Sequence, residues 1–180
     1  MAVARTADEL DGATRLILPG VGSFDHAMEL LDASGMRARL DHLVLEQAVP
    51  VLGICVGMQI LAGASEEGRL PGLGWVDGRV QRLHADRPGA KLRLPHMGWN
   101  DVSPVGVPSA LFAGLEQDAR FYFLHTYYFG CERAETMLAQ CDYGGPFACA
   151  VHSRNVFGVQ FHPEKSHQWG TRLLKNFAEV

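Results

Sequence analysis

Short apolar runs alternate with amphipathic stretches through the first third of the chain. Residues 16–18 form an apolar run that Pro19-Gly20 stops, which predicts a buried strand ending in a tight loop. Apolar residues then recur at helical spacing, and Ser23 or Asp25 is available to cap the first helix. The predicted order is strand, helix, helix, strand and helix start, over 16–18, 23–31, 36–47, 49–54 and 58–62.

The second half of the chain is punctuated by glycine turns and is richer in aromatic residues. Short strands are predicted there, together with a closing helix, over 72–83, 120–129, 136–140, 155–161 and 169–177. Strands followed by helices in the first half imply parallel pairing, and the second half indicates an antiparallel insertion. We therefore predict an α/β fold, with a mixed, mainly parallel sheet that is flanked by helices.

Composition places the chain among ordinary globular proteins. Its 180 residues are 47% hydrophobic and 20% charged, which fits a single domain over 1–180. The net charge is −4 and lysine and arginine are not clustered, so neither a nucleic-acid partner nor an anionic membrane surface is expected. No apolar stretch approaches the ~18 residues of a membrane span, and the first residues lack the apolar core of a secretory signal. We expect a cytoplasmic protein.

The four cysteines lie far apart, and no CxxC pair occurs. This pattern argues against a disulfide framework and against a zinc site. His96, His125 and His152 have no metal-ligand spacing, so we expect them to be structural. No metal and no cofactor is predicted.

One cysteine stands apart because of its neighbours. Gly53-Ile54-Cys55-Val56-Gly57 lies between a predicted strand and a predicted helix, which is the nucleophile-elbow pattern with cysteine in the serine place. The helix N-terminus is expected to lower the pKa of the thiol, and backbone N–H groups there can hold an oxyanion. The alternative is a buried structural cysteine, and the pentapeptide alone does not decide between the two.

His162 is the best candidate for the base that such a thiol needs. It follows directly after the predicted strand over 155–161, and Glu164 stands two residues further on, where it can orient the imidazole. A lone His-Pro-Glu is more often a surface loop. Together with Cys55 at another strand end, it predicts a site at one edge of the sheet.

Several motifs now make a family resemblance specific. Segments 18–24, 53–59 and 160–166 resemble the class I glutamine amidotransferases. Segments 95–100 and 123–128 resemble, within that class, the glutaminase subunits of imidazole glycerol phosphate synthases. The resemblance covers nearly the whole chain, and it implies a flavodoxin-like fold.

The resemblance also implies roles for individual residues. Cys55 would attack the side-chain amide of glutamine and release ammonia, with His162 moving the proton and Glu164 orienting the ring. The N–H groups of Val21 and Val56 would form the oxyanion hole, and whether the loop that carries Val21 must first flip is left open. The residues that match substrate-binding positions are Gly22, Gln59, Glu67, Thr126 and Tyr127.

A partner subunit is implied as well. Met97, Trp99, Tyr122 and Lys165 match positions that face a synthase (cyclase) subunit, a (β/α)8 barrel that receives the ammonia within a heterodimer. That enzyme makes imidazole glycerol phosphate and AICAR in histidine biosynthesis. A core tryptophan at 99 and a solvated lysine at 165 remain the alternatives.

One departure from the family leaves two further readings open. Family members begin with a strand and a helix before the segment that resembles 6–10, and this unit is expected to be missing here. The chain would then be a truncated, inactive remnant that binds a partner, unless its start is misplaced. Alternatively, segments 165–170 and 74–75 somewhat resemble those of glutaminase subunits that supply ammonia for an amidino group on a bacterial surface sugar.

Overall fold

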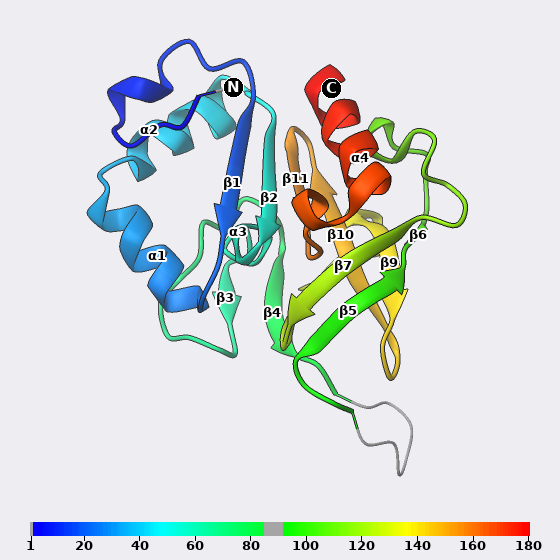
Figure 1. The fold of residues 1–180 in the computed structure, drawn as a ribbon. Coiled ribbons are helices and arrows are strands. Elements are labelled where there is room, and N and C mark those ends of the chain that lie inside the picture. The colour runs from blue at the N-terminus through cyan, green and yellow to red at the C-terminus, as the bar shows by residue number, and fades with distance from the viewer. Residues whose placement is uncertain (1, 85–91) are drawn as a thin grey trace.

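A six-stranded mixed sheet forms the centre of the molecule in the computed structural model, which describes residues 2–84 and 92–180 (Figure 1). The strands run in the order β1-β2-β11-β10-β9-β6. The pairs β1–β2 and β2–β11 are parallel, whereas β10, β9 and β6 join antiparallel. Their bounds are Leu16–Gly20 (β1), Val51–Cys55 (β2), Val156–Val159 (β11), Pro146–Ser153 (β10), Met137–Asp142 (β9) and Ser103–Pro104 (β6).

Two smaller sheets stand beside this one. A three-stranded sheet joins β3 (Ala64–Ser65), β4 (Gly78–Arg82) and β8 (Tyr127–Cys131). A two-stranded antiparallel ribbon pairs β5 (His96–Asp101) with β7 (Arg120–His125), and Figure 1 shows it below the C-terminal helix. The pair β3–β4 is parallel, whereas β4–β8 and β5–β7 are antiparallel and belong to the antiparallel part that the glycine-rich second half predicts.

Helices cover the central sheet from two sides. The helices α1 and α2 lie to one side and α4 lies to the other (Figure 1). No helix within the described ranges is both long and apolar enough to cross a membrane. The bounds are Phe24–Ala33 (α1), Arg37–Asp41 (α2) with a π-helical turn His42–Glu46, Val56–Gln59 (α3) and His167–Glu179 (α4), with 3-10 turns at Asp8–Leu10, Ala110–Phe112, Ala134–Thr136 and Pro163–Lys165.

The strand β2 is buried on both of its faces. Val51 belongs to the core beneath α1, with Phe24 and Met28, whereas Leu52 belongs to the core beneath α4, with Leu173. A strand covered on both faces needs apolar residues at every position, not at alternate ones. This explains the uninterrupted apolar run that the sequence shows before Cys55.

The predicted fold class is confirmed, and several element boundaries differ. The single strand predicted over 120–129 is wrong, because the chain breaks at Thr126 and continues in another sheet as β8. Pro19-Gly20 does not stop β1 but belongs to it, as a proline can where a strand lies at the edge of a sheet. The helix predicted to start at 58 is only the four-residue α3. The strands β5 and β10 were not predicted.

Candidate active site

Cys55 occupies a sharp turn between β2 and α3. It is the last residue of the strand and the N-cap of the helix, with φ 56° and ψ −114°. A non-glycine residue with positive φ is strained, and such strain concentrates at functional sites. The structure therefore has the strand–turn–helix geometry that the glycine-flanked cysteine predicts.

Cys55 is buried, and its sulfur contacts two segments that are distant in the sequence. Its thiol donates to the Leu124 carbonyl oxygen at 3.9 Å, and Gln160 Nε2 donates to Sγ at 3.8 Å. Burial is the main reason why the pKa of the thiol is raised to about 11, and the charge of Glu164 raises this pKa further. A hydrogen bond from the Val56 backbone N–H lowers the pKa, but by less. The prediction of a lowered pKa is wrong here, because α3 is four residues long and desolvation outweighs its terminus. The thiol is protonated at neutral pH and needs a base.

His162 and Glu164 form a close pair. The distance from His162 Nδ1 to Glu164 Oε1 is 2.8 Å, and only 5% of His162 is exposed. The His162 backbone N–H donates to the Tyr122 carbonyl at 2.8 Å, which ties the residue to β7. With Nδ1–H held by the carboxylate, Nε2 is left with the lone pair that a base requires.

A cavity of about 350 Å³ joins these groups. This volume lies at the small end of the range for ligand pockets, as suits a ligand of amino-acid size. Glu164 is paired with His162 but is not among the residues that line the cavity. The wall contains Val21, Gly22, Cys55, Val56, Gln59, Glu67, Pro95, Leu124, His125, Thr126, Tyr127, His162 and Lys165, and so brings together all the predicted oxyanion and substrate-binding residues.

Two of the predicted substrate-binding side chains already have partners within the protein. Gln59 Nε2 donates to the Tyr127 carbonyl at 3.0 Å and to Gln160 Oε1 at 3.1 Å. Glu67 Oε2 accepts from the Phe24 N–H at 2.9 Å, at the start of α1.

The N-terminus of α1 is therefore capped by Glu67, a residue that is distant in the sequence. Ser23 is the N-cap residue, yet its side chain makes no capping bond, and Glu67 satisfies the helix N-terminus instead. Asp25 accepts from the N–H groups of Arg69 and Leu70, so it fixes the loop that carries Glu67. The prediction that Ser23 or Asp25 caps the helix is wrong for both side chains.

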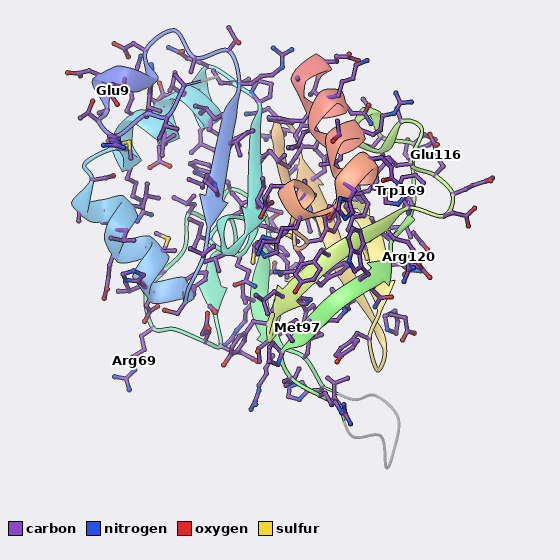
Figure 2. The ribbon with its side chains drawn as sticks, in the orientation of Figure 1. Glu9, Arg69, Met97, Glu116, Arg120 and Trp169 are labelled. Carbon is purple, nitrogen blue, oxygen red and sulfur yellow. The ribbon has the colours of Figure 1, made fainter. Side chains whose placement is uncertain are left out.

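The residues matched to a partner interface share one surface beside the cavity. Trp99 lies opposite Tyr122 in the β5–β7 ribbon, and Met97 lies opposite Leu124, so all four side chains are on one face. Met97 is 65% exposed and Trp99 is 40% exposed, which excludes a core tryptophan (Figure 2 labels Met97). Lys165 Nζ stands 5.7 Å from the centre of the Tyr122 ring.

Two buried histidines connect this ribbon to the cavity wall. His125 Nδ1 donates to the Tyr127 carbonyl at 2.8 Å, and its Nε2 is 3.0 Å from His96 Nδ1. Burial lowers the pKa of His125 to about 3 and that of His96 to about 4, so both are neutral. That both are structural stays a prediction, and no pattern in the sequence indicated that His125 lines the cavity. Among the described residues, no group of three His, Cys, Asp or Glu could hold a metal ion.

This neutral pair predicts a loss of stability on acidification. Since both pKa values lie below the ~6.5 of an unfolded chain, protons bind preferentially to the unfolded state as the pH falls below that value. Each histidine should cost about 2 kcal/mol of unfolding free energy at pH ~5 and nothing above pH ~7. His125→Asn, which keeps a donor for Tyr127, should flatten this dependence in urea unfolding. His26→Asn, at an exposed position, should leave it unchanged, and equal slopes in both variants would contradict the assignment.

Comparison with known proteins identifies the class. Residues 2–180 match the family described as glutamine amidotransferase class-I, so the chain belongs to that family and is a glutamine amidotransferase. A solved structure described as a glutamine amidotransferase has a TM-score of 0.71 at 23% identity, covering 98% of this chain and 83% of that one, which shows a shared fold.

More similar relatives narrow the class to one kind of subunit. The imidazole glycerol phosphate synthase subunit HisH of Bdellovibrio bacteriovorus is 62% identical over 100% of this chain and 88% of its own length. The subunit of the same name from Leptospira interrogans is 49% identical over 99% of this chain and 87% of its own length. The chain therefore stands with the HisH glutaminase subunits of histidine biosynthesis, which confirms the resemblance found in the motifs.

Proposed function

We propose that the chain hydrolyses glutamine to glutamate and ammonia, and passes the ammonia to the synthase (cyclase) subunit of an imidazole glycerol phosphate synthase. That subunit is a (β/α)8 barrel, and the two form a heterodimer in the cytoplasm. The observation that carries the proposal is one cavity of about 350 Å³, which is lined by Cys55 at its strained turn and by His162 paired to Glu164.

The proposed reaction uses these groups in sequence. His162 Nε2 takes the proton of Cys55, and Sγ attacks the side-chain amide carbon of glutamine. The N–H groups of Val56 and Val21 hold the oxyanion, and the imidazolium gives its proton to the leaving ammonia. Water, with His162 as base, then hydrolyses the glutamyl thioester. Glu164 holds Nδ1–H throughout, over the 2.8 Å contact.

Glutamine itself would lie along the far wall of the same cavity. Gln59 has both N–H groups engaged by Tyr127 and Gln160, so its amide oxygen is the atom available to accept from an ammonium group. Gly22 and Thr126 line the same cavity. Glu67 would act as a second acceptor while it caps α1.

The exposed face of the β5–β7 ribbon is the proposed docking surface for the partner. Met97 and Trp99 present apolar area to solvent next to the cavity, and Tyr122 with Lys165 extends the same surface. The names of the relatives favour a histidine-pathway partner over a surface-sugar amidotransferase.

We expect the isolated chain to release ammonia slowly. Cys55 is a protonated thiol whose pKa lies near 11, and the loop that carries Val21 is exposed. Completing one oxyanion donor is worth about 10²–10³ in rate, so binding of the partner and its nucleotide substrate should raise glutamate release by about that factor. The measurement is glutamate release by the chain alone, with the cyclase subunit, and with both subunits and the nucleotide.

Each result has a distinct meaning. Fast turnover without a partner would contradict the proposed gating. Absence of turnover in a complex that forms normally would indicate the inactive, partner-binding alternative.

A further inference from the structure

Gln160 is a fully buried amide beside the nucleophile. It follows β11 and is 0% exposed. Its backbone N–H donates to the Cys149 carbonyl at 2.9 Å, which fixes the residue to β10. A buried side-chain amide must find its own partners inside the protein, so the identity of those partners carries information.

The two ends of this amide meet two members of the site. Gln160 Oε1 accepts from Gln59 Nε2 at 3.1 Å, and Gln160 Nε2 donates to Cys55 Sγ at 3.8 Å. Gln59 Nε2 in turn donates to the Tyr127 carbonyl at 3.0 Å. A continuous chain of hydrogen bonds therefore runs from the cavity wall to the sulfur.

We propose that Gln160 is a positioning residue for the nucleophile, whose amide N–H holds the Cys55 sulfur while its amide oxygen fixes Gln59. The inference rests on the proposed function, in which Cys55 attacks glutamine and Gln59 binds it. A single side-chain amide would thereby fix the position of the Cys55 sulfur relative to the Gln59 side chain.

The charges around the sulfur explain why a donor is needed there. Burial is the largest cause of the raised pKa of Cys55, and Glu164 raises it further, whereas the Val56 N–H, Lys165 and Gln160 lower it. His162 and His125 face the same cavity. A hydrogen bond to a thiolate is stronger than one to a thiol because it is charge-assisted. Gln160 therefore makes the thiolate easier to form when His162 removes the proton.

The test is the rate at which iodoacetamide alkylates Cys55, followed by mass spectrometry at one mildly alkaline pH. Gln160→Met keeps the length and volume of the side chain but removes the amide donor. Gln160→Leu also removes the donor, with a branched side chain of different shape. Loss of a charge-assisted hydrogen bond should slow alkylation of Cys55 by roughly tenfold in both variants.

Matched controls separate this role from a loss of packing. Asn176→Leu removes another buried amide, which donates to the carbonyl groups of Leu111 and Ala113. None of these three residues lines the cavity, so the variant should leave the Cys55 rate at the wild-type value. Cys149 is fully buried, so its protection from alkylation reports that each variant is folded. Wild-type or faster alkylation in folded Gln160→Met would overturn the proposal. Because the assay needs neither glutamine nor a partner, its failure is distinct from a failure of the proposed reaction.

Discussion

Replacement of Cys55 by alanine is expected to lower the rate of ammonia release from glutamine by about 10⁴-fold or more. Loss of the covalent nucleophile has an effect of this size in other enzymes. Among the described residues that line the cavity, Cys55 alone carries a thiol. Alanine fits the space of the thiol, so the strained turn and the fold should persist. The measurement is glutamate release by the complex with its cyclase subunit.

An ammonium salt supplied to the same variant provides the decisive comparison. If Cys55 serves only to make ammonia, the partner should still form its product from added ammonium in the Cys55→Ala complex. Cys131→Ala removes the same atoms from a half-buried thiol on β8 and should keep glutamine-dependent turnover. Retained glutaminase activity in Cys55→Ala would refute the assignment of the nucleophile. Loss of ammonium-dependent turnover as well would indicate a damaged interface.

Local patterns in the sequence were sufficient to predict the strand–turn–helix geometry at Cys55. The run before Cys55 is apolar at each position because β2 lies between two cores. Gly53 and Gly57 are needed because other backbone segments pass too close to them for a side chain to fit. His162 could be paired with Cys55 because parallel strands end at one edge of a sheet. Each of these inferences needs only neighbours in the chain and the rule of strand direction.

Features that depend on distant contacts could not be predicted in this way. Glu67 caps α1 across 43 positions of sequence, and Gln59 meets Gln160 across 101. The break at Thr126 follows from two different strand partners, which no periodicity within 120–129 encodes. The pKa of Cys55 was predicted with the wrong sign because burial depends on the packing of β7 and residue 160 around the sulfur.

Replacement of Gly57 by alanine is expected to destabilise the protein by about 3 kcal/mol or more. A Cβ at this position would lie 1.8 Å from the Leu18 carbonyl oxygen and 2.9 Å from its carbon. Both are backbone atoms of β1, so α3 must move away from the sheet. Helix propensity alone predicts the opposite sign, since alanine is favoured over glycine inside a helix by about 0.5–1 kcal/mol. Urea unfolding of the purified chain measures the difference directly.

Gly63→Ala is the matched control for this substitution. A Cβ there would meet no heavy atom within 4 Å, so the free energy of unfolding should change by less than about 1 kcal/mol. Equal stability of both variants would mean that α3 does not pack against β1 at the observed distance. Since α3 carries the Val56 N–H beside Cys55, its displacement should also remove glutaminase activity from whatever fraction of Gly57→Ala remains folded. The same close approach that stabilises the fold would then hold the oxyanion donor in place.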